Sequence, residues 1–239
     1  MKDVLITGAG GTLGEFTAQQ LRADGYGVTG VRSSRVSGAT AVEEDHSESI
    51  SVNLLDDDAV ETIVDFLARK EIKIHALVHL ARSKSNLAGP LSGREAWLRE
   101  FQLAAYLPFR LALALNREHN LDRVVIGSSI YGLVAQNPAM YPSEEMLNPH
   151  YGAAKAAAIQ VARDLAVRLA PTCQVNSISW GGISSGMSSA VDEAYSARNP
   201  SGKMLSLDDA LGAIRFLLSP NSAGMTGHNL VVDGGWTAW

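Results

Sequence analysis

Short apolar runs alternate with longer amphipathic stretches along most of the chain. The apolar runs are rich in β-branched residues and bounded by turn residues, which is typical of strands. They lie at residues 4–7, 27–31, 74–80, 123–128, 174–179 and 229–232. The stretches between them show the helical spacing of apolar positions, at residues 11–24, 57–69, 94–116, 151–169 and 206–218. Acidic residues at 56–58 and 208–209 favour helix N-termini at these points.

Strands that are separated by helices connect through right-handed crossovers, and the resulting parallel sheet is covered by helices on both faces. The pattern therefore predicts an α/β fold, a doubly wound parallel sheet in three layers. The 239 residues contain neither a linker nor an internal repeat that would divide them. We expect a single domain over residues 1–239.

Composition and charge narrow the class of protein. Hydrophobic residues make up 46% of the chain and charged residues 19%, which is ordinary globular usage. The net charge of −5 argues against nucleic acid as a partner, because phosphate binding needs clustered cations. The sequence contains no apolar run of membrane-spanning length and no signal peptide at its start. The lone Cys173 is expected to be a small core residue, and together these features predict a cytoplasmic protein.

A glycine-rich turn follows the first predicted strand. Residues 7–14 read Thr-Gly-Ala-Gly-Gly-Thr-Leu-Gly and lead directly into a helix. Glycines allow a backbone to approach a pyrophosphate closely, and the free amides at a helix start bind its charge. A turn of this kind also occurs without a ligand, but its position between a strand and a helix favours a dinucleotide site.

The residue at the end of the second strand selects between dinucleotides. A site for NAD places an acid there, against the ribose 2′-hydroxyl. Here Arg32 is followed by Ser33 and Ser34, and a guanidinium suits a 2′-phosphate. We therefore predict NADP(H), with NAD(H) as the alternative if Arg32 is only a solvated loop cation.

A tyrosine and a lysine share one face of the helix at 151–169. Tyr151 and Lys155 stand at i and i+4, so the ammonium can favour the phenolate. A tyrosine that works as an acid or base near neutral pH needs such help, because an ordinary phenol titrates near 10. The strand at 123–128 leads into Ser128 and Ser129, which places hydroxyl groups at the edge where open α/β sheets bind ligands.

These motifs together resemble the short-chain dehydrogenase/reductase family, along nearly the whole chain. Residues 128–132, 176–182 and 226–235 also carry the resemblance. The resemblance implies a Rossmann-type domain that moves hydride between a nicotinamide and a carbonyl or alcohol. It implies that Tyr151 is the acid/base, that Ser129 orients the substrate oxygen, and that Lys155 binds the nicotinamide ribose and lowers the tyrosine pKa. The cofactor-binding residues that follow from the motifs and the resemblance are Thr7, Gly8, Gly11, Thr12, Leu13, Gly14, Arg32, Ser33, Asn53, Leu54, Leu80, Ala81, Tyr151, Lys155, Gly182, Ile183 and Ser185, with Asn53 near the adenine and Ile183 and Ser185 near the carboxamide.

The chain departs from the family pattern at several positions. His79-Leu80-Ala81-Arg82 stands where many relatives have Asn-Asn-Ala-Gly. The active-site asparagine is absent from the helix at 94–116; its place falls at Ala104, and the nearest amide is Gln102. Trp180 replaces a proline and is expected to reshape the nicotinamide edge.

The sequence also predicts where two histidines and the residues around the substrate pocket lie. His79 is expected to pack at a strand end, and no residues stand at metal-ligand spacing, so no metal is predicted. His150 is expected at the helix start or the surface. The segment 132–150 is expected to form one wall of the substrate pocket. Apolar side chains expected in a pocket or lid are Tyr131, Met140, Tyr141, Met146, Met187 and Tyr195.

The predicted function is an NADP(H)-dependent oxidoreductase that acts on a ketone or secondary alcohol, with a sugar-derived or acyl substrate. A sugar substrate predicts a polar, hydrogen-bonding pocket, and an acyl-carrier substrate predicts a basic patch at the pocket mouth. The alternative is a cofactor-binding sensor or structural protein that has lost turnover. The alanines of the helix at 151–169 form a small-residue surface, which together with the resemblance predicts a homo-oligomer, a tetramer or a dimer.

Overall fold

The computed structural model of the chain describes residues 2–34, 40–44, 47–83, 93–141, 147–184 and 189–239. Their strands form one twisted sheet in the order β3-β4-β2-β1-β5-β6-β7-β8, in which β3 is antiparallel to β4 and all other pairs are parallel. The strands are β1 (Asp3–Thr7), β2 (Gly27–Ser33), β3 (Thr40–Glu44), β4 (Ser47–Val52), β5 (Ala76–His79), β6 (Arg123–Ser129), β7 (Gln174–Trp180) and β8 (Asn229–Val232). The predicted doubly wound parallel sheet is confirmed, and β3 and β4 are additions to it.

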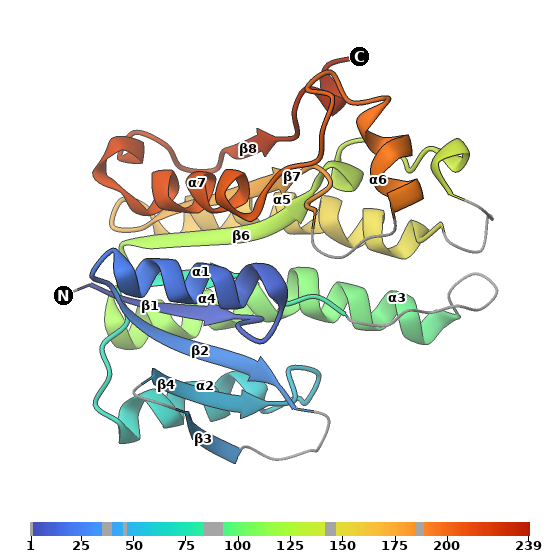
Figure 1. The fold of residues 1–239 in the computed structure, drawn as a ribbon. Coiled ribbons are helices and arrows are strands. Elements are labelled where there is room, and N and C mark those ends of the chain that lie inside the picture. Colours follow the sequence, from blue (N-terminus) through green and yellow to red (C-terminus); the bar gives the residue numbers. More distant parts are fainter. Residues whose placement is uncertain (1, 35–39, 45–46, 84–92, 142–146, 185–188) are drawn as a thin grey trace.

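Helices cover both faces of the sheet (Figure 1). The α-helices are α1 (Thr12–Ala23), α2 (Ala59–Arg69), α3 (Arg94–Phe101), α4 (Leu107–His119), α5 (Pro149–Leu169), α6 (Ser189–Ser196) and α7 (Leu207–Leu218), and short turns lie at η2 (Ile130–Gly132), η3 (Pro138–Met140), η5 (Pro220–Ser222) and η6 (Trp236–Ala238). The helix α6 was not predicted. The start of α7 is a capping box, in which the Ser206 hydroxyl accepts from Asp209 N at 3.0 Å and the Asp209 carboxylate accepts from Ser206 N at 2.9 Å.

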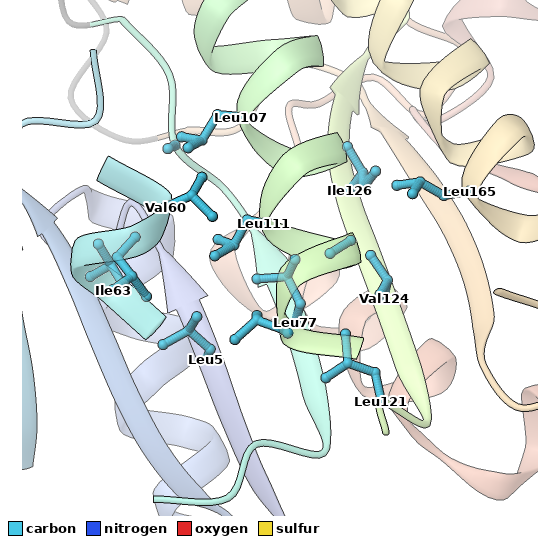
Figure 2. Packing of buried hydrophobic residues seen from close by; sticks show 14 of the residues in the cluster. Leu5, Val60, Ile63, Leu77, Leu107, Leu111, Leu121, Val124, Ile126 and Leu165 are labelled. Atoms are coloured by element: carbon cyan, nitrogen blue, oxygen red, sulfur yellow. The ribbon is translucent and has the colours of Figure 1, made fainter. Parts of the chain in front are cut away.

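Two hydrophobic clusters hold the layers together. On one face, α2, α4 and α5 pack on the sheet through buried residues such as Ile63, Leu111 and Leu165 (Figure 2). On the other face, α1 and α7 pack through residues such as Leu21 and Ile214. Cys173 is 2% exposed within the first cluster, and burial raises its pKa to about 12, so the expected core role is confirmed.

The predicted helix at 94–116 is interrupted by a π-helical turn. The turn η1 (Gln102–Tyr106) separates α3 from α4, and the Leu107 amide bonds to the Gln102 carbonyl, five residues back. Pro108 follows in the first turn of α4, and proline has no amide hydrogen to donate to the residue four positions earlier. The π turn accommodates this loss and leaves the Leu103 carbonyl available to a partner outside the helix.

The chain order of the strands reverses between β1 and β5. From β1 the chain builds outward to β2 and β4, and from β5 it builds in the other direction to β8. In open α/β sheets, ligands bind at the carboxyl ends of the strands beside such a reversal. No helix among the described residues combines the length and apolar character that crossing a membrane requires.

Candidate active site

The glycine-rich turn between β1 and α1 lies at this reversal. Gly8 has a φ of +76°, and a Cβ on it would lie 2.7 Å from the Ala81 nitrogen that follows β5. A Cβ on Gly14 would lie 2.2 Å from the Gly8 carbonyl oxygen. Both contacts are with backbone, so no side chain is tolerated at either glycine. The turn is therefore wedged between the ends of β1 and β5.

The start of α1 offers free backbone amides. Gly11 precedes the helix, its own amide bonds to the Gly8 carbonyl at 3.0 Å, and no side chain in the described part of the chain caps the helix. Thr12 is exposed and Leu13 is half-buried against the second cluster. Uncapped amides at a helix start, together with the positive end of the helix dipole, form a site for an anion such as a pyrophosphate.

Arg32 lies beside the same turn. It is the last residue but one of β2, next to the exposed Ser33, and its Cγ would be 3.7 Å from a Cβ placed on Gly10. The parallel register Ser33↔Val52 brings the following residues Asn53 and Leu54 to this edge. Asn53 is held in a local turn, because its amide nitrogen donates to Asp56 Oδ1 at 2.6 Å and its oxygen accepts from Leu55 N at 3.3 Å. Asn53, which is predicted to lie near the adenine, is thus at the same edge as Arg32, whereas Leu54 is 2% exposed and packs in the first hydrophobic cluster.

The ends of β1 and β5 are joined by a buried histidine. His79 is completely buried; its Nδ1 lies 2.7 Å from Thr7 Oγ1 and its Nε2 lies 2.8 Å from the Leu103 carbonyl oxygen. A carbonyl only accepts, so Nε2 carries the hydrogen and Nδ1 accepts from the threonine hydroxyl. Burial, followed by repulsion from Lys155, lowers the His79 pKa to about 3, so the ring is neutral. The expected strand-end packing of His79 is confirmed.

Beyond His79, Leu80 and Ala81 continue along the glycine turn. The Leu80 amide donates to the Thr7 carbonyl at 3.1 Å, and Ala81 is 4% exposed.

Ser129, Tyr151 and Lys155 meet where β6 packs against α5. The Ser128 hydroxyl donates to the Lys155 carbonyl at 2.8 Å, and the Lys155 ammonium donates to the Gly127 carbonyl at 2.9 Å. A Cβ on Gly132 would lie 2.8 Å from the Lys155 carbonyl carbon, so η2 and α5 approach each other closely. These contacts hold the end of β6 against the first turns of α5.

The electrostatics around Tyr151 favour a protonated phenol. Burial raises its pKa, a hydrogen bond with Ser129 and the charge of Arg82 oppose that rise, and Glu100 adds to it. The Lys155 Nζ lies 5.7 Å from the centre of the Tyr151 ring. In the structure, Arg82 is the cation that lowers the Tyr151 pKa. The expected lowering of the Tyr151 pKa by Lys155 stays a prediction.

Lys155 itself is 5% exposed. Burial lowers its pKa to about 8, Glu100 opposes this, and Arg82 adds to it. A lysine that titrates near 8 can exchange its proton close to neutral pH, which is a common property of active-site lysines.

The segment after β7 is positioned by an aromatic pair. The Gly182 amide donates to the Tyr195 hydroxyl at 2.9 Å, and the Tyr195 ring stacks on Trp236 with centres 4.4 Å apart. Ile183 bridges to Leu205. Tyr195 is 3% exposed, so it supports this segment from the core side. Ser185, Met146 and Met187 lie outside the described residues.

The wall beside Tyr151 is polar. The Tyr131 and Tyr141 hydroxyls lie 2.8 Å apart, and the Gln136 amide donates to the Tyr141 hydroxyl at 3.2 Å. Tyr131 and Tyr141 are half-buried, and Met140 is 5% exposed in a small cluster with Ile130 and Tyr195. Met140 and Tyr195 therefore belong to a core rather than to an open pocket or lid.

The expectation for Trp180 was wrong, and the structure also places His150 and Gln102. The Trp180 side chain is buried towards α7, where its Nε1 donates to the Ala210 carbonyl at 3.2 Å, so it does not form the edge of the site. His150 lies in the first turn of α5, so the expected helix-start position is confirmed; it is 4% exposed, and its ring centre lies 6.2 Å from that of Trp97. Gln102, the amide nearest to the place of the missing asparagine, lines an open groove on the outer surface with Gln160 and Asp164.

Two charged residues of the site escaped the sequence analysis. Arg82 is exposed and acts on Tyr151 and Lys155 from the end of β5, and Glu100 is buried on α3. Arg82 was noticed only as a departure from a motif. Glu100 stands one helical turn before Ala104, and this spacing was the signal that could have found it.

Comparison with known proteins identifies the family. A match to the family described as Enoyl-(Acyl carrier protein) reductase covers residues 8–237. The structure is similar to that of a short chain dehydrogenase from Leptospira borgpetersenii with bound NAD+, with a TM-score of 0.83 at 24% identity, covering 99% of this chain and 92% of the other. The chain belongs to the short-chain dehydrogenase/reductase family. It is therefore a dehydrogenase or reductase that acts on alcohol or carbonyl groups.

Curated relatives of this short-chain dehydrogenase/reductase act on different substrates. An NADP-dependent mannitol dehydrogenase of Hypocrea jecorina is 30% identical, over 99% of this chain and 92% of the relative. A 3-oxoacyl-[acyl-carrier-protein] reductase of Escherichia coli is 26% identical, over 98% and 96%. A D-erythrulose reductase of Gallus gallus is 29% identical, over 97% and 94%.

Proposed function

We propose that this chain transfers hydride between NADP(H) and a ketone or secondary alcohol, with Tyr151 as the acid/base. The observation that carries the proposal is the meeting of Ser129, Tyr151 and Lys155 beside the glycine-rich turn. The Tyr151 pKa is raised by burial, so the phenol is protonated at neutral pH and serves as a proton donor in the reducing direction. Ser129 hydrogen-bonds with Tyr151 and would donate to the same substrate oxygen.

The residues around the turn fit a dinucleotide. The cradle at Gly8 and Gly14 has no room for a Cβ, and the start of α1 presents uncapped amides. The glycine turn would hold the pyrophosphate, Asn53 and Leu54 would border the adenine, and Lys155 would bind the nicotinamide ribose. Leu80, Ala81, Gly182 and Ile183 would flank the ring. When bound, the nicotinamide supplies or accepts the hydride.

Arg32 favours NADP(H) over NAD(H). Its side chain stem lies against Gly10, and no acid follows β2 at this point. A guanidinium contact with a phosphate contributes about 1.5 to 3 kcal/mol, so Arg32→Ala should weaken NADPH binding about 10-fold to 150-fold and leave NADH binding nearly unchanged. Fluorescence titration of both cofactors measures this. The exposed Arg69 of α2 provides the control, because Arg69→Ala should alter neither affinity; an unchanged NADPH preference in Arg32→Ala would exclude the assignment.

The polar wall favours a hydroxylated substrate such as a keto sugar. The hydroxyls of Tyr131 and Tyr141 and the amide of Gln136 form a hydrogen-bonded network beside the acid/base tyrosine. Two of the curated relatives are named for a sugar alcohol or a keto sugar. An acyl substrate is the second candidate, and the acyl-carrier-protein reductase among the relatives supports it.

The deciding experiment is a panel assay that follows NADPH oxidation by the purified protein. The panel contains keto sugars, 3-oxoacyl thioesters and quinones. We expect the highest kcat/KM on a keto sugar. NADPH binding without turnover of any compound would instead support the alternative of a cofactor-binding sensor or structural protein.

The outer face of α3, η1, α4 and α5 supports a homo-oligomer, a tetramer or a dimer. An open groove of about 600 Å³ runs there and is lined by Leu98, Phe101, Gln102, Ala105, Tyr106, Phe109, Gln160, Val161 and Asp164. Leu98 is 52% exposed and Tyr106 47%, which is unusual for large apolar side chains gathered on one face. Of the alanines on α5, Ala154 and Ala158 face the core, so the larger apolar side chains would make the contact. Light scattering tests this, because a particle of 25.4 kDa would exclude an oligomer.

We also propose a cytoplasmic location, because the lone Cys173 is a buried free thiol, which fits a reducing compartment.

A further inference from the structure

A buried carboxylate on α3 faces the proposed active site. Glu100 lies in the last turn of α3 and is 5% exposed. The helices α3 and α5 pack against each other, and the rings of Trp97 and His150 mark their contact with centres 6.2 Å apart. Glu100 hydrogen-bonds with Ser83, after β5, and interacts with the charge of Lys155 on α5, the helix that also carries Tyr151.

The carboxylate is not fully satisfied by its hydrogen bonds. A hydrogen bond with Ser83 reaches it, but Glu100 Oε2 is buried and has no hydrogen-bond partner among the described residues. A buried charge of this kind is unfavourable unless a nearby opposite charge or a function compensates for it. Burial raises the Glu100 pKa above its ordinary value, although three cations oppose this rise: Lys155 first, then Arg82 and Arg99.

The charges that face Lys155 come from two elements besides its own. Arg82, after β5, disfavours the ammonium, and Glu100, on α3, favours it. His79 also faces Lys155 but is neutral, and Tyr151 lies on the same helix face. Without Glu100, Lys155 would be a buried cation near a second cation, Arg82. Such a lysine would lose its proton at a lower pH.

Near Glu100, the described part of the chain offers no other group for this task. Ala104, one turn after Glu100, is 2% exposed, and its methyl side chain has no polar atom. Gln102 points into the groove on the outer surface. Glu95, on the same helix as Glu100, is exposed and pairs with Arg99 at 2.9 Å.

We propose that Glu100 is a positioning residue of this active site, whose carboxylate holds the Lys155 side chain in its charged form beside Tyr151. The proposal rests on the hydride-transfer function proposed above. Glu100 acts through Lys155 and makes no contact with the reacting atoms. Because its charge also raises the Tyr151 pKa, it helps to keep the phenol protonated for donation.

Two neutral variants and one charged variant test the proposal. Glu100→Gln removes the charge and keeps the shape of the side chain. Glu100→Met also removes the charge, and its apolar side chain suits a buried site, so it replaces the glutamine variant if that variant does not fold. Glu100→Asp keeps a carboxylate. Glu95→Gln is the matched control, because it removes an exposed carboxylate from the same helix.

The first readout is independent of catalysis. The Lys155 side chain is titrated by NMR of the ¹³Cε nucleus in the full-length protein, with Lys155→Met to assign the signal. In the wild type we expect a pKa of about 8. In Glu100→Gln and Glu100→Met it should fall by about one unit, the low end of what a nearby charge produces. In Glu100→Asp the Lys155 pKa should lie between the wild-type value and that of the neutral variants. In Glu95→Gln it should equal the wild-type value.

The second readout is the pH profile of kcat in the reducing direction. Reduction needs a protonated Tyr151 and a charged Lys155, and loss of the Glu100 charge lowers both pKa values. The basic limb should therefore move to lower pH in the neutral variants, with little change in KM, and return towards the wild type in Glu100→Asp.

The outcomes separate this proposal from the proposed function. An active wild type with an unchanged Lys155 titration in both neutral variants would overturn the role of Glu100, even if those variants unfold at a lower temperature, because that combination indicates a purely structural residue. A wild type that transfers no hydride, although Lys155 still responds to Glu100, would overturn the proposed function and would leave Glu100 only as the group that keeps Lys155 charged.

Discussion

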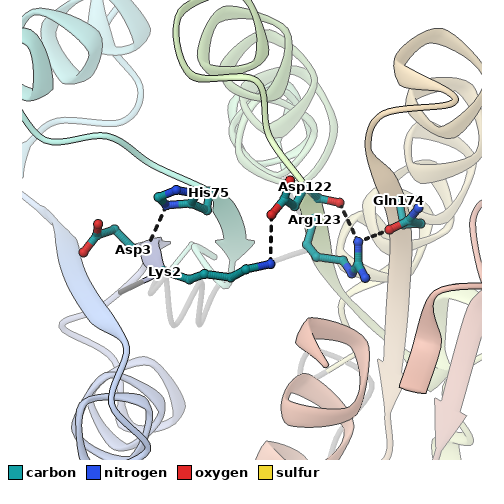
Figure 3. Close-up of polar contacts among 6 residues, drawn as sticks. All are labelled: Lys2, Asp3, His75, Asp122, Arg123 and Gln174. Atoms are coloured by element: carbon teal, nitrogen blue, oxygen red, sulfur yellow. Dashed lines mark hydrogen bonds and ion pairs between the residues drawn. The ribbon is translucent and has the colours of Figure 1, made fainter. Parts of the chain in front are cut away.

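Charged side chains such as Lys2 are exposed at the edge of the sheet where the parallel strands begin, whereas charged side chains such as Lys155 are buried at the edge where the strands end. At the edge where the parallel strands begin, Lys2 pairs with Asp122 at 3.0 Å, Arg123 donates to Gln174, and His75 accepts from the Asp3 amide at 3.1 Å (Figure 3). The side chains of Lys2 and Asp122 are 64% and 42% exposed, so water screens their interaction.

At the edge where the strands end, ionisable side chains are buried. His79, Glu100 and Lys155 are each 5% exposed or less, and the pKa of each has moved away from its ordinary value. Burying such groups destabilises the fold, and proteins accept this where the groups perform chemistry. The comparison implies that changes at the carboxyl edge alter activity and pH dependence, whereas changes at the amino edge alter stability slightly.

The largest expected difference between the edges is in turnover. Tyr151→Phe keeps the ring and deletes the proton, so kcat should fall at least about 100-fold, the low end of general acid/base catalysis, while NADPH still binds. Tyr26→Phe is the same change just before β2 at the amino edge, and it should leave kcat unchanged. Steady-state kinetics on the best ketone of the panel measure both. Near-normal turnover by Tyr151→Phe would mean that the proton comes from another group.

One substitution should have opposite effects on stability in two helices. Gly14→Ala places a Cβ against the Gly8 carbonyl and should destabilise the fold by about 1 to 3 kcal/mol and weaken NADPH binding. Gly212→Ala, at an open position on α7, should stabilise the fold by about 0.5 to 1 kcal/mol. Urea unfolding gives both values. Equal effects would show that the glycine cradle is not tightly packed.

The buried His79 should make stability depend on pH. Its pKa is about 3 in the fold and about 6.5 in the unfolded chain, so only the unfolded state binds a proton between these values. The free energy of unfolding should therefore fall as the pH falls below 6.5, by up to about 1.4 kcal/mol per pH unit from this group. His79→Gln should remove that part of the slope. Urea unfolding between pH 4 and 7 measures it, and identical slopes would contradict the assignment.

The smallest expected effect belongs to the amino edge. A double-mutant cycle of Lys2→Ala and Asp122→Ala should give a coupling below about 1 kcal/mol, because both side chains are exposed. The double variant should keep the wild-type kcat. A coupling of several kcal/mol, or a loss of turnover, would contradict the inference that changes at the amino edge alter stability only slightly.

Much of the fold followed from local patterns. The apolar runs predicted β1, β2, β5, β6, β7 and β8, and the helical spacing predicted α1, α2, α5 and α7. The strand β4 was missed because its sequence, Ser-Glu-Ser-Ile-Ser-Val, lacks a continuous apolar run; it becomes a strand by pairing with β2. The strand β3 was missed with it, because β3 pairs with β4. The interruption at η1 was missed because Pro108 was read as part of a continuous helix.

The sequence by itself determined the sheet class, the glycine turn and the pairing of Tyr151 with Lys155, because each depends on residues close together in the chain. Only the tertiary structure decided which groups surround them. Arg82, in the segment after β5, and Glu100, on α3, both act on Lys155; the Trp180 side chain is buried in the core, and Gln102 lines the groove on the outer surface. Spacing along a chain gives the face of a helix or strand on which a residue lies. The burial and the charges that set its pKa depend on what packs against that face.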